Sequence, residues 1–198
     1  MTFSFNLGNN FRWLLDTVIF LRRHFAVIIT LGLIAAFGRV IQLGGFGAIS
    51  SWTNIVLEVI VESTRILLFL YVLGMASIRD GVLRIKRFFI HKENRRLHVS
   101  MAIDKLKKQW LPILLNITGF LMIAFAINYL IDLLAYETCL YLSLKKDGIL
   151  SASASEWTVL LFFKNLSVIP FTLAFEAGFL LWITNKFQNQ TQSRFRNS

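Results

Sequence analysis

Several ionisable side chains of this 198-residue chain lie inside long apolar stretches of the sequence, where a charge is costly. An ionised group at membrane depth is usually paired with an opposite charge or faces a water-filled cavity. Two kinds of chemistry follow: ion pairs that close a helical bundle, or a site that handles an ion or a proton. The candidate residues are Arg39, Glu58, Glu62, Arg65, Asp132 and Lys164.

The spacing of these residues predicts that they gather in one layer of the outer leaflet. Glu58, Glu62 and Arg65 stand at i, i+4 and i+7, so they share one face of a helix. The layer would hold equal numbers of cations and anions. Such a balance is typical of a structural network and argues mildly against a selective pore, which generally uses a ring of one sign. The sequence leaves both interpretations open, structural network and ion or substrate site.

The elements that would position these charges are four apolar stretches. A hydrocarbon core of about 30 Å needs about 20 mostly apolar residues, and residues 109–131 contain no charge at all. The charged fraction of 16% is well below the roughly 25% usual in soluble domains. We therefore expect an all-α fold: an integral membrane bundle of four transmembrane helices in one domain over residues 1–198, with amphipathic helices on the cytoplasmic surface. The expected spans are about 25–44, 52–78, 110–134 and 157–183.

The positive charge of the chain, +10 in all, is concentrated on one side of these expected spans. Many of the cations fall in residues 79–109, which we call the basic segment. The connection between the first two stretches has no Lys or Arg, and Lys145 and Lys146 are the only cations between the third and fourth. The positive-inside rule then predicts cytoplasmic N- and C-termini. A bacterial inner membrane is the expected location.

The basic segment is also the candidate binding surface. Its apolar residues recur at helical spacing, as in an amphipathic helix, at Val99, Ala102, Ile103, Leu106 and Trp110. A basic amphipathic helix beside a membrane binds anionic lipid headgroups. An acidic protein partner is the second interpretation, and nucleic acid is the one that this sequence favours least. The candidate cations are Arg84, Lys86, Arg87, Arg95, Arg96, Lys105, Lys107 and Lys108.

Two further segments have expected roles. In residues 9–24, Arg12, Asp16 and Arg23 form a narrow polar face. This pattern predicts either a helix at the membrane surface that turns into the first span near Arg23, or an uninterrupted cytoplasmic extension of that span. Residues 137–156 include a run of alternating Ser and Ala and predict a flexible external linker.

The sequence contains no phosphate-binding loop, no dinucleotide-binding glycine pattern and no zinc-protease motif. Its one cysteine, Cys139, excludes an intramolecular disulfide, and no pair of histidines inside a span could ligate haem. We expect no enzyme activity, no cofactor and no metal site. The expected function is that of a non-enzymatic accessory, anchoring or regulatory subunit that binds a protein partner or its own copies. The alternative is an oligomeric channel or transporter that uses the charged layer; a membrane enzyme ranks third.

Overall fold

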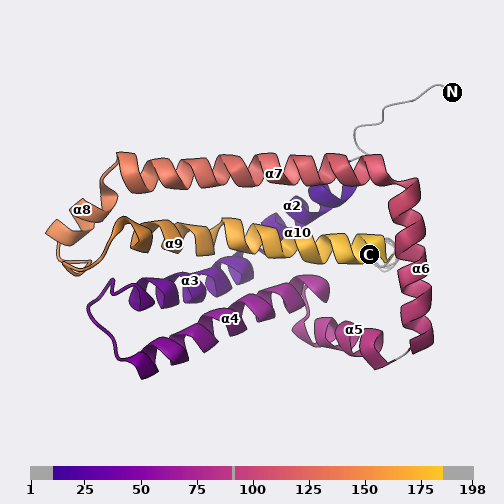
Figure 1. The fold of residues 1–198 in the computed structure, drawn as a ribbon, viewed down its shortest axis with the longest axis horizontal. Helices are drawn as coiled ribbons and strands as arrows, with labels where there is room; N and C mark the ends of the chain where they lie inside the picture. Colours follow the sequence, from indigo (N-terminus) through magenta and orange to yellow (C-terminus); the bar gives the residue numbers. More distant parts are fainter. Residues whose placement is uncertain (1–10, 91, 185–198) are drawn as a thin grey trace. The chain divides into compact units, whose positions relative to one another are not determined.

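The computed structural model describes residues 11–90 and 92–184 (Figure 1). Within these ranges the chain is all-helical and has no strands. The elements are α2 (Arg12–Arg23), α3 (Phe25–Gln42), α4 (Ser51–Leu73), α5 (Ile78–Ile90), α6 (Lys92–Lys108), α7 (Trp110–Asp132), the π-helix η1 (Leu133–Glu137), α8 (Leu140–Lys146), α9 (Glu156–Leu166) and α10 (Val168–Ile183).

Three helical stretches are long and apolar enough to cross a membrane: Phe25–Gln42, Trp110–Glu137 and Glu156–Ile183. They correspond to three of the four predicted spans. The fourth prediction, residues 52–78, falls mostly on α4, which has 23 residues and therefore sufficient length. Glu58, Glu62 and Arg65 make α4 less apolar than the three candidate spans. Length and composition therefore do not confirm the four-span bundle.

Several helix boundaries follow from side-chain capping. The Ser50 hydroxyl accepts a hydrogen bond from the amide of Thr53 at 3.1 Å, and the Ser77 hydroxyl accepts one from Asp80 at 3.3 Å. These serines satisfy amides in the first turns of α4 and α5, which have no partner within their own helices. The described part of the basic segment is almost entirely helical, as α5 followed by α6.

The described chain forms two compact units, each assembled from segments distant in sequence. The first unit comprises residues up to Arg23, residues 69–122 and residues from Ala174 onward. The second unit comprises residues 24–68 and 123–173. The helices α4, α7 and α10 each contribute residues to both units.

Trp13 of α2 forms the aromatic centre of the first unit. Its side chain is 1% exposed, and its ring lies 4.6 Å from that of Phe175 and 4.8 Å from that of Phe179. The fully buried Asn116 of α7 accepts a hydrogen bond from the backbone amide of Leu14 at 3.0 Å. Because Leu14 lies in the first turn of α2, this side chain caps α2 from another helix. One face of α2 is thus packed against protein, and the helix is interrupted at His24, near the predicted turn.

The core of the second unit lies between α3, α9 and the segment that precedes α9. Val40, Ala135, Ala154 and Leu160 are buried together in it. A Cβ atom at Gly32 would lie 3.2 Å from the carbonyl oxygen of Asn165, so glycine allows α3 and α9 to approach closely.

The predicted flexible linker 137–156 is instead folded in this second unit. It begins at the last residue of η1 and contains α8, and the amide of Ser151 donates a hydrogen bond to the carbonyl oxygen of Gly45 at 2.7 Å. Leu150 and Ala154 enter the core. The alternating Ser and Ala residues therefore do not mark a linker here, because their backbone and small side chains pack against the end of α3.

Candidate functional site

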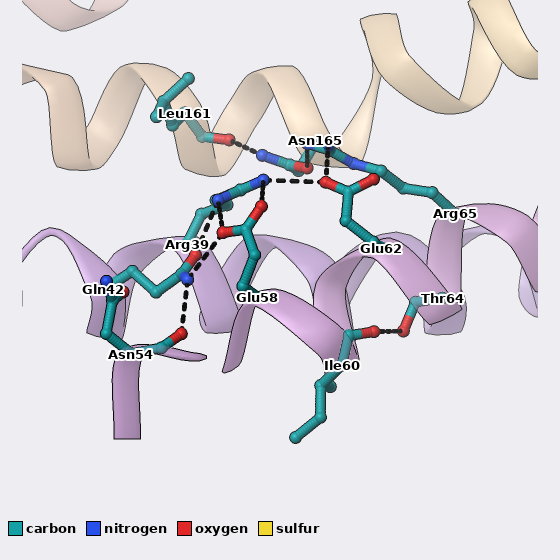
Figure 2. A network of polar contacts seen from close by, with 10 residues as sticks. All are labelled: Arg39, Gln42, Asn54, Glu58, Ile60, Glu62, Thr64, Arg65, Leu161 and Asn165. Atoms are coloured by element: carbon teal, nitrogen blue, oxygen red, sulfur yellow. Dashed lines mark hydrogen bonds and ion pairs between the residues drawn. The ribbon is translucent and has the colours of Figure 1, made fainter. Parts of the chain in front are cut away.

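Arg39 of α3 lies between two carboxylates of α4 (Figure 2). Its guanidinium group contacts Glu58 through two hydrogen bonds, of 2.6 Å and 3.1 Å, and Glu62 through one of 2.9 Å. The two glutamates are one helical turn apart, so both reach the same arginine. The predicted shared face of α4 is therefore directed at α3.

Glu62 is shared between two cations. Its Oε1 atom accepts a hydrogen bond from Arg39 and another, of 2.6 Å, from Arg65 one turn further along α4. Arg65 also donates to the side-chain oxygen of Asn165 in α9 at 2.8 Å. Asn165 is 1% exposed and donates in turn to the carbonyl oxygen of Leu161. We call Arg39, Glu58, Glu62 and Arg65 the charge cluster; through Asn165 it links α3, α4 and α9 (Figure 2).

Two amides that the sequence analysis did not identify complete the charge cluster. Asn165 is one of them, and Gln42 is the other: its side chain accepts from Arg39 at 2.8 Å and donates to Glu58 at 3.0 Å. Gln42 stands three residues after Arg39, which is helix-neighbour spacing and a usable signal. Asn165 offers no comparable signal, because its contact with Arg65 depends on the packing of α9.

Asp132 and Lys164 form a separate and weaker pair. The Lys164 ammonium group lies 4.0 Å from the Asp132 carboxylate, at the limit of an ion pair. Within residues 11–90 and 92–184, no ion pair or hydrogen bond joins either residue to the charge cluster. The structure thus divides the six predicted charges into a tight group of four and a loose group of two.

The charge cluster is electrically neutral, with two cations and two anions, and its carboxylates are more exposed than its cations. The side chains of Glu58 and Glu62 are 49% and 46% exposed, against 20% and 23% for Arg39 and Arg65. Neutral pairing is the usual way to offset the cost of charge in an apolar environment. The geometry suits a structural junction, and the outward carboxylate faces leave room for contact with water, an ion or a partner.

Two cations of the basic segment cap the ends of other helices. Arg84 of α5 donates a hydrogen bond of 2.5 Å to the carbonyl oxygen of Leu73, the last residue of α4. Lys105 of α6 donates one of 2.5 Å to the carbonyl oxygen of Trp182 in α10, and its ammonium group lies 4.0 Å from the centre of the Trp182 ring. A cation at a helix C-terminus is favourable, because unpaired carbonyl groups and the helix dipole attract it.

Both capping cations are partly removed from water. Burial lowers the pKa of Arg84 and the pKa of Lys105. The close crossing of α4 and α5 explains the position of Arg84: a Cβ atom at Gly81 would overlap the carbonyl oxygen of Leu70, so only glycine fits there. Lys105, predicted as part of a free basic surface, is therefore a packing residue as well.

The other predicted cations with described side chains face solvent. Lys86, Arg87, Lys107 and Lys108 are exposed, whereas the side chains of Arg95 and Arg96 lie outside the described residues. In the part of the chain that the structure describes, most of the predicted apolar stripe is exposed: Val99 is 45% exposed, Ile103 45%, Leu106 42% and Trp110, the first residue of α7, 62%, while Ala102 is half-buried. The amphipathic pattern is confined to the C-terminal half of α6, because Arg95 and Arg96 fall on the same face as the stripe in the N-terminal half; α5 is the more strongly amphipathic helix of the basic segment.

Among the residues that the structure describes, no group of three or more His, Cys, Asp and Glu side chains could hold a metal ion. No known protein family matches the chain, and no similarity to a curated protein or to a solved structure was found.

The charge cluster predicts an energetic coupling between Glu62 and Arg65. Glu62→Gln leaves Arg65 without a carboxylate partner, whereas Arg39 keeps Glu58; Arg65→Gln introduced in addition removes the unpaired cation. We expect the double variant to lose less stability than the sum of the single variants, by about 0.5–3 kcal/mol. The measurement is the free energy of unfolding from a reversible denaturant titration in mixed micelles.

The matched control is a second cycle that combines Glu62→Gln with Lys164→Gln. Lys164 belongs to the separate pair with Asp132, so these two substitutions should be additive to within about 0.5 kcal/mol. Additivity in the Glu62–Arg65 cycle, or equal coupling in both cycles, would contradict the shared carboxylate.

Proposed function

We propose that this chain is a multi-pass protein of the cell inner membrane that acts as a non-enzymatic accessory or anchoring subunit. In this proposal α4 is the fourth span, both termini lie in the cytoplasm, and the basic segment lies on the cytoplasmic surface. The three helical stretches that are long and apolar enough to span support membrane insertion. The neutral charge cluster supports the addition of α4.

The exposed stripe of α6 is the observation that carries the proposed anchoring role. Ile103 and Leu106, each more than 40% exposed, would be costly in water and are accounted for by lipid tails or an apolar partner surface. At 100° per residue, Lys107 and Lys108 lie about 80° and 180° from Val99 around the helix. Lys107 therefore borders the stripe, where headgroups would lie, and Lys108 points away from it, where an acidic protein partner could bind.

Fluorescence quenching on full-length protein tests this arrangement of α6. In a Cys139→Ser background, Ile103→Cys places a dye on the apolar stripe, and Asp104→Cys places the same dye on the neighbouring polar face as a matched control. In nanodiscs with anionic lipid, we expect lipid-attached quenchers to act on position 103 and aqueous iodide to act on position 104. Lys107→Gln should weaken the immersion by about 1 kcal/mol, Lys108→Gln, on the side away from the stripe, should weaken it less, and added salt should weaken it further.

Equal quenching of both positions by iodide would show that α6 lies in water and would overturn the proposed anchoring surface. Immersion that responds to neither Lys107→Gln nor salt would remove electrostatic attraction from the proposal.

The exposure of the cluster carboxylates favours one second candidate, an oligomeric channel or transporter. Glu58 and Glu62 each present about half of the side-chain surface outward from the cluster. Facing carboxylates from several copies would form the ring of one sign that cation selectivity generally requires. Flux of a monovalent cation into proteoliposomes measures this activity directly.

The accessory function predicts no flux above that of empty liposomes for the unsubstituted chain. The channel predicts a cation flux that Glu62→Gln abolishes while the protein remains folded. Asp132→Asn is the matched control, because its carboxylate belongs to the separate pair with Lys164. A flux that is lost only on Glu62→Gln would replace the accessory function by the channel.

A further inference from the structure

An apolar groove of about 230 Å³ lies in the first unit between the end of α4, α5 and the end of α10. Phe69, Leu73, Phe88 and Leu180 contribute to its walls. This volume exceeds the roughly 30 Å³ of one water molecule several-fold but is smaller than the roughly 300–1,000 Å³ of a site that encloses a whole ligand. It suits part of a long apolar chain whose remainder lies outside.

Arg84 is the charged residue in the wall of this groove. It uses Nη1 to cap Leu73 and makes no ion pair within the part of the chain that the structure describes, so its other guanidinium N–H groups are available to an acceptor. Burial lowers the pKa of Arg84 most strongly, the nearby Asp80 raises it, and Arg87 lowers it to a smaller extent. Asp80 offsets part of the cost of burial without forming an ion pair in the described residues, so the groove combines apolar walls with a partly buried cation that a bound anion would stabilise further.

The groove opens beside an apolar surface of α5 that no element within residues 11–90 and 92–184 covers. Val82 is 47% exposed, Phe89 68% and Ile90 59%, while Lys86 and Arg87 are exposed on the same helix. This is the pattern of a helix at the level of lipid headgroups. The groove also lies at the end of the apolar stretch Glu156–Ile183, where a membrane-spanning helix would reach the headgroup region.

We propose that this groove binds one anionic phospholipid. An acyl chain lies against Phe69, Leu73 and Leu180, and the phosphate accepts hydrogen bonds from Arg84. The planar guanidinium group of an arginine matches the oxygen atoms of a phosphate better than the single ammonium group of a lysine does. The inference rests on the proposed function, because it requires α5 to lie at the membrane surface.

Charge complementarity favours a lipid over the chain's own C-terminal residues. Residues 185–198 follow the groove-lining Thr184 directly and contain Lys186, Arg194 and Arg196 but no Asp or Glu. They carry positive charge and offer no carboxylate side chain to Arg84. A phospholipid supplies both the apolar chain and the anion.

Native mass spectrometry of the full chain in neutral detergent tests the proposal. Phosphatidylglycerol and phosphatidylcholine with identical acyl chains are titrated separately. We expect one phosphatidylglycerol to bind in preference to phosphatidylcholine, and Arg84→Gln to weaken its binding about tenfold. Arg84→Lys, which keeps the charge, should retain a preference for the anionic lipid. Arg79→Gln is the matched control, an exposed arginine of α5 outside the groove, and should leave the affinity unchanged.

Leu180→Trp is a second variant that fills the groove without altering the charge. It should abolish the tight binding of phosphatidylglycerol even if Arg84→Gln proves unstable. Phosphatidylglycerol binding that is unaffected by Leu180→Trp would overturn the proposal and leave the groove to residues 185–198 or to a protein partner. Equal losses of phosphatidylglycerol affinity in Arg79→Gln and Arg84→Gln would also overturn it. That result would still agree with a general attraction of the basic segment to anionic lipid, so the proposed function would stand.

Discussion

The carboxylate of Glu62, held between Arg39 and Arg65, is the interaction on which this account of the molecule depends. An ionised residue in an apolar helix is tolerated when its charge is paired and its hydrogen-bonding groups are satisfied. Here a single oxygen accepts from both arginines, Glu58 holds Arg39 from the other side, and the four charges sum to zero. This neutrality is the physical reason for proposing that α4 spans the membrane beside three helices of ordinary apolar composition.

Cations also satisfy polar groups at the ends of two helices, where carbonyl groups lack partners within the helix. Arg84 and Lys105 of the basic segment each satisfy a carbonyl group in the last turn of another helix. Two cations of the basic segment therefore pack it within the first unit, while Lys86, Arg87, Lys107 and Lys108 are exposed. The segment predicted as a free basic surface is a pair of helices, two of whose cations serve in packing.

Helix content, the positions of three candidate spans and the shared face of Glu58, Glu62 and Arg65 could all be predicted from sequence, because they depend on local spacing. Contacts between helices could not. Asn165 enters the charge cluster only because Gly32 lets α9 approach α3. Spacing along the chain predicts one layer for all six charges, Asp132 and Lys164 included, but it carries no information about how each helix is rotated about its axis toward its neighbours. Residues 137–156 resemble a linker in sequence because small polar residues are common in linkers, but the backbone of Ser151 bonds to Gly45.

Whether α4 crosses the bilayer is the most direct question for this account, and accessibility of single cysteines on its two sides answers it. Ala48→Cys precedes α4 and Glu93→Cys follows α5, each in the Cys139→Ser background. A membrane-impermeant maleimide added to intact cells should label position 48, and should label position 93 only after the membrane is permeabilised. Labelling of both positions from the same side would show that α4 does not span. Labelling of position 93 alone in intact cells would keep the span but contradict the cytoplasmic orientation of the basic segment.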